Sequence, residues 1–373
     1  MNWSSVTRRL GRLVMGSAGL VVLLLVIVKL TVGVQFQKSA IQEKRPALPR
    51  FTHVIVIMME NHGDRALMHN PRAGYIDQLM HSWGYDTNYY GLTHPSLPNY
   101  VGALSGRTMG SHSDSPVQRF KQMTLVQQLD RRHISWQAVM QSIPSSGFRG
   151  NWYPDRLPKN HAPIVAPPTA LYAKKHNPFA LFPALNPSRG EHTVNLTQFQ
   201  RELASGHLAQ FTWITPNLCN DMHGQSLGAG AECPVNNPAL LVSRGNEFLR
   251  QLIPAILRSK AWNTRSVIFL TWDETNDPTH FLSAAGLRSY LRPGPASPMI
   301  PVFNIAIGGG RVPLLVLYGR YPHAIRTNLW ADHYSVLKTI EDSWHLPYLG
   351  HAANARVPVL TPFFTQNKTS SAR

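Results

Sequence analysis

The sequence predicts an α/β protein with a mostly parallel central sheet and helices on both faces. Short apolar, β-branched runs of the kind that form strands buried on both faces alternate with longer amphipathic runs. Strands are expected at 53–59, 209–215, 266–272 and 313–318, and helices at 74–83, 97–105, 124–133, 238–260 and 333–344. This alternation is typical of sheets covered by helices on both sides.

The composition describes a globular, strongly basic protein. The chain has 373 residues, 43% of them hydrophobic, and a formal net charge of +17. A positive surface favours anionic partners such as phosphate esters and anionic lipid headgroups. The basic residues are scattered and no nucleic-acid-binding motif accompanies them, so we predict no nucleic-acid partner.

The N-terminal sequence predicts a membrane anchor. Three arginines precede an apolar stretch long enough to cross a hydrocarbon core of ~30 Å. The basic flank stays in the cytoplasm, which places the rest of the chain outside. A cleaved signal peptide, and therefore a secreted protein, is the alternative. The expected order is a cytoplasmic tail, a transmembrane signal anchor, a linker, one folded domain and a disordered tail, at residues 1–12, 13–34, 35–50, 51–364 and 365–373.

Cys219 and Cys233 are the two cysteines of the chain. In an oxidising compartment they would close a short loop, which is worth about 3 kcal/mol in the chain-entropy model. The alternative is a pair of unpaired, buried thiols. Export and the closeness of the two residues in sequence favour the disulfide.

Polar residues follow three of the expected strands. Glu60 and Asn61 follow the first strand, and Asp273 and Glu274 follow the third. The carboxyl ends of parallel strands meet at one edge of a sheet, where ligands bind. These four residues are oxygen donors, which suit Ca²⁺, Mg²⁺ or Mn²⁺ better than Zn²⁺. The sequence therefore predicts a divalent metal site at this edge.

Asp221, His223 and His333 form a second candidate set that contains nitrogen donors. Asp221 and His223 follow the strand at 209–215, and His333 lies at an expected helix start with Asp332 as its N-cap. A second site of this composition would suit Zn or Fe. The alternative for His333 is a position at the helix start without any ligand role.

The segment THPSLPNY contains the candidate nucleophile, Ser96. Pro95 and Pro98 fix a turn, and a helix can begin near Ser96. Backbone N–H groups at a helix N-terminus stabilise an anion. A metal would lower the pKa of the serine so that it attacks phosphorus, while Asn99 donates to a phosphoryl oxygen. The alternative is that Ser96 only caps the helix.

Seven motifs, in order along residues 51–350, resemble the bacterial phosphoesterase family of phospholipases C and acid phosphatases, which belongs to the alkaline-phosphatase-like superfamily. The THPSLPNY form is most similar to the short secreted acid phosphatases, including those that act on phosphoinositides. The motifs are HVIVIMMENH, THPSLPNY, SWQAVMQSIP, YAKKHNPFALF, FTWITPNLCNDMHG, SVIFLTWDE and DHYSVLKTIEDSWHLPYLG.

The resemblance implies roles for particular residues. The metal ligands beside Ser96 would be Glu60, Asn61, Asp273 and Glu274. A second metal or a proton donor would be positioned by Asp221, His223 and His333. The HNP motif would place His176 and Asn177 near the substrate.

The chain departs from the family pattern at three places, and because of these departures the resemblance does not define which substrate the protein prefers. They are Gly63-Asp64, Thr275-Asn276-Asp277 and the segment 278–312.

We therefore expect an extracytoplasmic, metal-dependent hydrolase of phosphomonoesters, in the manner of an acid phosphatase. Ser96 would form a phosphoserine, with protons moved by His223, His333 or His94. Phosphoinositides or other lipid phosphates would suit the basic surface. The alternatives are a phospholipase C that releases phospholipid headgroups, a headgroup transferase, and a non-catalytic surface protein that binds polyanions.

Overall fold

The computed structural model describes residues 48–185, 192–275, 293–297 and 308–365. The predicted anchor and residues 366–373 of the predicted C-terminal tail lie outside these residues. Within the described part of the chain, no helix combines the length and the apolar character needed to span a membrane.

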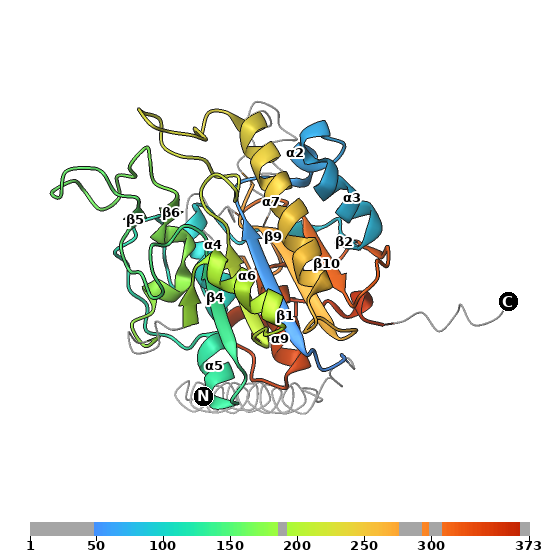
Figure 1. The fold of residues 1–373 in the computed structure, drawn as a ribbon. Helices are drawn as coiled ribbons and strands as arrows, with labels where there is room; N and C mark the ends of the chain where they lie inside the picture. Colours follow the sequence, from blue (N-terminus) through green and yellow to red (C-terminus); the bar gives the residue numbers. More distant parts are fainter. Residues whose placement is uncertain (1–47, 186–191, 276–292, 298–307, 366–373) are drawn as a thin grey trace, which may run out of the picture. The chain divides into compact units, whose positions relative to one another are not determined.

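An eight-stranded sheet forms the centre of the domain (Figure 1). The strands around its middle, including β1, β8, β9 and β4, run parallel, whereas β10 runs antiparallel to both of its neighbours. The prediction of a mostly parallel sheet is confirmed. The strand order is β11 (Arg326–Thr327), β2 (Gly84–Asp86), β10 (Leu314–Tyr318), β9 (Ser266–Trp272), β1 (His53–Met59), β8 (Phe211–Thr215), β4 (Trp136–Met140) and β7 (Thr193–Val194).

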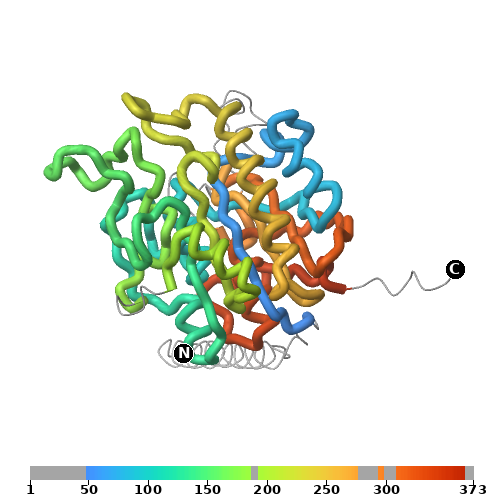
Figure 2. Tube along the Cα trace, in the orientation of Figure 1, coloured from blue at the N-terminus to red at the C-terminus, as the bar shows by residue number. Residues whose placement is uncertain are grey.

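Strand β1 occupies the middle of this sheet. Its last residue, Met59, is in register with Trp272, the last residue of β9. On its other side, Ile57 pairs with Ile214 near the end of β8. Figure 2 shows β1, in blue, between segments from later parts of the chain. This register brings the residues that follow β1 and β9 side by side.

Helices pack on both faces of the sheet. Val56 and Trp213 line a small internal cavity together with residues of three helices on one face. These helices are α4 (Ser96–Ser105), α5 (Leu125–Arg131) and α9 (His333–Ser343). Figure 1 shows two further helices crossing the opposite face, with a third packed on one of them. They are α6 (Leu196–Ser205), α7 (Pro238–Arg258) and α3 (Gly74–Ser82).

Short elements complete the domain. Two small sheets lie outside the main one, and α2 and several 3-10 turns connect the larger elements. The small sheets pair β12 (Ala331–Asp332) with β3 (Tyr89–Tyr90) and β5 (Trp152–Tyr153) with β6 (Tyr172–Ala173), and α2 covers Asp64–Leu67.

The sequence predicted the long elements well and missed the short or mixed ones. The strands expected at 53–59 and 266–272 have those bounds in the structure, and the five expected helices are all present within two residues of each end. Strands β4 and β2 and helix α6 were not predicted. Strand β4 contains Gln137 between apolar residues, yet all five of its residues are buried, so neither a continuous apolar run nor an exposed polar face marked it.

Candidate active site

The acidic residues at the strand ends meet at one edge of the sheet. Glu60 follows β1, Asp273 and Glu274 follow β9, and Asp221 lies in the loop after β8. The main-chain N–H of Glu60 donates to the carbonyl of Asp221 at 2.8 Å. Asn61 adopts a left-handed backbone conformation with φ 63°, and its N–H donates to Asp273 Oδ1 at 2.9 Å. The convergence predicted from the strand pattern is present.

The hydroxyl of Ser96 faces these carboxylates. Helix α4 begins at Ser96, as predicted, and the Ser96 side chain is 2% exposed. Its Oγ donates to Glu60 Oε2 at 3.0 Å and lies 3.5 Å from Glu274 Oε1. The N-cap residue of this helix is Pro95, which makes no side-chain cap, and the Ser96 hydroxyl is engaged with the acidic residues.

Burial and the charges of neighbouring carboxylates raise the pKa values of Glu60, Asp273 and Asp221. Burial raises the pKa of Glu60 well above its ordinary value, and the charges of Asp273 and Asp221 raise it further. Burial, followed by the charge of Glu274, raises the pKa of Asp273 to about 8. Burial also raises the pKa of Asp221 strongly. Buried like charges are unfavourable unless a cation compensates them.

The donor set fits a divalent metal ion. Asp273 Oδ2 and Glu60 Oε1 are buried and lack a hydrogen bond. The nearby Ser96 side chain lowers the pKa of Asp273, but by less than burial raises it. An unsatisfied buried acceptor costs about 1–3 kcal/mol. Coordination by a hard cation would satisfy such oxygens, which are the donors that Ca²⁺, Mg²⁺ and Mn²⁺ prefer.

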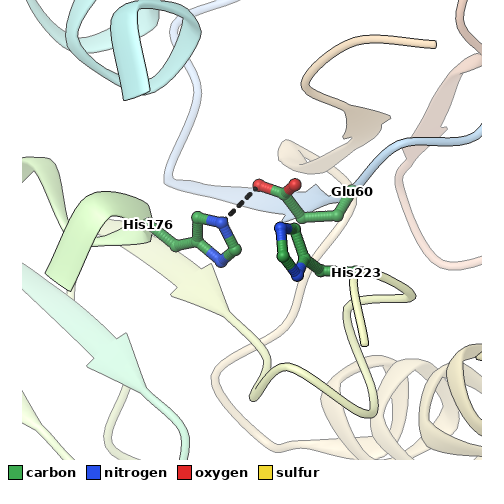
Figure 3. A group of neighbouring side chains, drawn as sticks. All are labelled: Glu60, His176 and His223. Carbon is green, nitrogen blue, oxygen red and sulfur yellow. Dashed lines mark ion pairs between the residues drawn. The ribbon is translucent and has the colours of Figure 1, made fainter. Parts of the chain in front are cut away.

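Glu60, His176 and His223 form a second, mixed group of donors (Figure 3). One ligand atom from each lies within 4.8 Å of the other two. Carboxylate with imidazole suits a transition metal better than a purely oxygen set does. The residues are therefore compatible with more than one kind of metal ion.

The ring of His176 lies between two carboxylates. Nε2 is 3.1 Å from Glu60 Oε1 and Nδ1 is 3.1 Å from Asp221 Oδ2. The ring also stacks on Tyr100, with centroids 5.3 Å apart. Burial, together with the charge of Lys175, lowers the pKa of His176 well below its ordinary value. The neighbouring Asn177 donates to the hydroxyl of Tyr172. The substrate-binding role of His176 and Asn177 stays a prediction.

Lys175 and Asp114 belong to the site although the sequence did not indicate them. Lys175 Nζ lies 2.6 Å from Asp114 Oδ2 and 3.0 Å from His223 Nε2. Burial alone would lower the pKa of Lys175, but Asp114 and Glu60 raise it above its ordinary value. Lys175 stands in the AKKHNP segment and Asp114 in a polar loop without a motif, so only the tertiary contact identifies them.

His223 is held as a neutral ring. Its Nδ1 lies 2.8 Å from the carbonyl of Gly224, to which it donates, and its Nε2 therefore accepts from Lys175. Burial, then the charge of Lys175, lowers the pKa of His223 to about 3. In the hydrogen bond between Lys175 and His223, Lys175 therefore carries the proton.

His333 lies behind the acidic residues. Asp332 caps α9, as predicted, and His333 is the first residue of that helix. Its Nε2 donates to the carbonyl of Asp273 at 2.7 Å, and its Nδ1 accepts from Tyr89 at 2.9 Å. Burial lowers the pKa of His333 to about 4. His94, another predicted proton carrier, forms an ion pair with Glu274 through Nδ1.

Asn99 holds the loop that precedes α4. Its Oδ1 accepts from the N–H groups of Leu92 and Thr93, and its Nδ2 donates to the carbonyls of Thr93 and Pro95. The side chain is fully buried. Its predicted contact with a phosphoryl oxygen stays a prediction, because the carboxamide is engaged within the loop here.

The predicted disulfide between Cys219 and Cys233 is present, with Cα atoms 5.5 Å apart. Asp221 and His223 both lie inside the loop that it closes. The crosslink therefore restrains the segment that brings these two residues to the edge of the sheet.

The fold and the site together define an α/β protein with a buried serine at a helix start, surrounded by acidic residues suited to a metal. A profile of the Phosphoesterase family matches residues 72–347, and the chain belongs to that family. The resemblance noted from the sequence motifs is confirmed.

Curated relatives carry phosphatase names. An acid phosphatase of Aspergillus fumigatus is 28% identical over 71% of this chain and 49% of its own length. A phosphatidylinositol-3-phosphatase of Mycobacterium tuberculosis is 24% identical over 83% of this chain and 82% of its own length. The chain spans about half the length of the fungal relatives that it matches. These relatives and the family support a hydrolase of phosphate esters.

Among solved structures, a protein in the alkaline phosphatase superfamily from Vibrio parahaemolyticus matches with a TM-score of 0.48 and 12% identity. The match covers 81% of this chain and 68% of the other.

Proposed function

We propose that this protein is a metal-dependent phosphatase that hydrolyses phosphomonoesters through a phosphoserine on Ser96. The observation that carries the proposal is the hydrogen bond from Ser96 Oγ to Glu60 Oε2 at the start of α4. A buried hydroxyl held against several carboxylates, two of whose oxygens lack a hydrogen bond, is arranged for activation by a cation.

The residues would share the reaction as follows. A divalent cation held by Glu60, Asp273 and Glu274, with Asn61 and Asp221 beside them, would lower the pKa of the Ser96 hydroxyl and polarise the phosphoryl group. Ser96 Oγ attacks phosphorus in line, and the leaving alcohol departs with a proton. Water then cleaves the phosphoserine. His94, which pairs with Glu274, would move protons in both steps, because both ring nitrogens of His223 are engaged by Gly224 and Lys175.

The substrate class follows from charge and from the relatives. The net charge of +17 favours anionic substrates, and one relative that matches over most of its length is named for a phosphoinositide. We therefore propose phosphomonoesters that include lipid phosphates. A phospholipase C activity on headgroup diesters is the second candidate. A diester carries a second organic group on phosphorus, and this activity would require room for that group at the rim of the site.

Replacement of Ser96 tests the nucleophile. Ser96→Ala should abolish turnover of p-nitrophenyl phosphate without loss of the fold. Ser105→Ala is the matched control, because Ser105 lies at the other end of α4 and donates to the carbonyl of Val101. Turnover that survives in Ser96→Ala would refute the mechanism.

Chelation and a substrate panel test the remaining parts. EDTA should remove the activity and a divalent ion should restore it; activity that resists chelation would exclude the metal. Turnover should then be compared for p-nitrophenyl phosphate, phosphatidylinositol 3-phosphate, bis-p-nitrophenyl phosphate and phosphatidylcholine. A strong preference for the two diesters would replace the phosphatase by the phospholipase C. A wild-type protein that turns over none of the four would favour a polyanion-binding protein.

A further inference from the structure

Lys175 is a buried cation that faces acidic groups beside the proposed nucleophile. It is 7% exposed, and its ammonium group contacts Asp114 and His223. The adjacent buried lysine, Lys174, donates to the carboxamide of Asn151.

Asp114 connects Lys175 to the start of α4. Its Oδ2 accepts from Lys175, and its Oδ1 accepts from the N–H of Leu97 at 3.0 Å. Leu97 directly follows Ser96 in the chain. One carboxylate therefore fixes the cation relative to the helix end that presents the nucleophile.

The groups that the sequence suggested for phosphoryl binding are engaged elsewhere. The N–H of Leu97 is used by Asp114, and Pro98 has no N–H to offer. The carboxamide of Asn99 is bonded within the preceding loop at both of its ends. The helix start thus offers fewer donors to an oxyanion than its position alone suggests.

The charge balance of the site calls for a further cation. When all four are ionised around one divalent ion, Glu60, Asp221, Asp273 and Glu274 carry more negative charge together than that ion neutralises. A phosphate dianion would still be repelled. An ammonium group within the same buried space would offset this repulsion strongly, because charges interact more strongly where bulk water is excluded.

We propose that the ammonium group of Lys175 binds the non-bridging oxygens of the phosphoryl group, and that Asp114 is the positioning residue that holds it there. The inference rests on the proposed phosphatase function and adds a substrate-binding residue to it. Lys175 keeps its proton throughout the transfer, so no additional proton or electron step is required. His223, which accepts from the same ammonium group, helps to orient it.

The test compares two adjacent lysines. Lys175→Met should lower kcat/KM for p-nitrophenyl phosphate by about 10²–10³-fold, the usual cost of losing one donor to a developing oxyanion. It should also raise the inhibition constants for inorganic phosphate and vanadate. Lys174→Met should leave both near the wild-type values, and Lys175→Arg, which keeps the charge, should recover part of the loss.

A merely structural role would leave anion binding unchanged. Unaltered inhibition by phosphate and vanadate in a folded Lys175→Met protein would overturn the proposal. If Lys175→Met does not fold, Asp114→Asn replaces it. That variant keeps the lysine but loosens its position, and it should weaken phosphate inhibition; unchanged inhibition would likewise overturn the proposal.

The outcome is separable from that of the proposed function. Binding of inorganic phosphate to the metal-loaded protein is measurable by calorimetry even if no ester is turned over. Weaker binding to Lys175→Met than to Lys174→Met supports the inference in that case. Equal binding to the two variants contradicts it, whatever the catalytic result.

Discussion

The acidic residues at the strand ends and the capping residues at the start of α9 are both buried, but their hydrogen bonds differ. Asp332 is fully buried, and its two oxygens accept from the N–H groups of Tyr334 and Ala296. Asp273 is equally buried, and its Oδ1 accepts from Asn61 while its Oδ2 has no hydrogen bond.

The pKa of each carboxyl group reflects the same difference. Burial raises the pKa of Asp332 to about 7, and backbone hydrogen bonds limit the rise. Burial raises the pKa of Asp273 to about 8, and the charge of Glu274 adds to it. The protein itself satisfies Asp332. It leaves Asp273 Oδ2 without a hydrogen bond, which supports the proposal that the strand-end cluster, rather than the helix start, holds a cation.

The largest expected effect is on activity. Asp273→Asn should reduce turnover of p-nitrophenyl phosphate more than about 100-fold, because loss of a ligand should exceed the 10–100-fold cost of losing an outer partner. Asp332→Asn should remain within that outer-partner range. Steady-state kinetics at saturating metal would measure both, and equal losses would remove the distinction between the two clusters.

The next effect is on stability, with opposite signs at the two positions. In metal-free protein, Asp273→Asn should increase the free energy of unfolding, because it removes a carboxyl group that is costly to bury and keeps an acceptor for Asn61. Asp332→Ala should decrease it by about 1–2 kcal/mol, the usual cost of losing a helix cap. Urea denaturation in EDTA would measure both; destabilisation by both variants would contradict the comparison.

A third effect is the pH dependence of stability without metal. The pKa of Asp273 is raised in the folded state, so the folded protein binds more protons and the free energy of unfolding falls as pH rises toward about 8. His223 and His333 have lowered pKa values and contribute the opposite slope, but only below about pH 6.5. Between about pH 6.5 and 8, stability should therefore fall with pH.

Saturating divalent metal should flatten this decline, and Asp273→Asn should reduce it in metal-free protein. Thermal melts across that pH range would measure the slope. A rising slope in the metal-free wild-type protein would show that the strand-end carboxylates do not carry raised pKa values.

The smallest effect concerns the contact between the two clusters. Tyr89→Phe removes the hydroxyl that donates to His333 Nδ1, which should cost about 1 kcal/mol of stability. Turnover should be unchanged, since His333 Nε2 still donates to the carbonyl of Asp273. Urea denaturation and steady-state kinetics would measure the two quantities. A large loss of turnover would instead assign His333 to proton transfer.

Local sequence determined much of this protein. An uninterrupted apolar run ending in Glu60-Asn61 and another ending in Asp273-Glu274 predicted two strands of one sheet and the edge where their acidic residues meet. Ser96 between two prolines predicted the helix start, and two nearby cysteines predicted the disulfide. Periodicity and turn residues act over a few positions, so they can be recognised without the fold.

Tertiary structure decided which side chains complete the site. Lys175 and Asp114 are 61 positions apart, and His176 lies between carboxylates from two different strand ends. The antiparallel course of β10 was likewise set by its neighbours. Charge pairing and buried hydrogen bonds depend on distance in space. The sequence therefore specified the acidic edge and its serine. Only the folded chain showed that the ammonium group of Lys175 lies beside them.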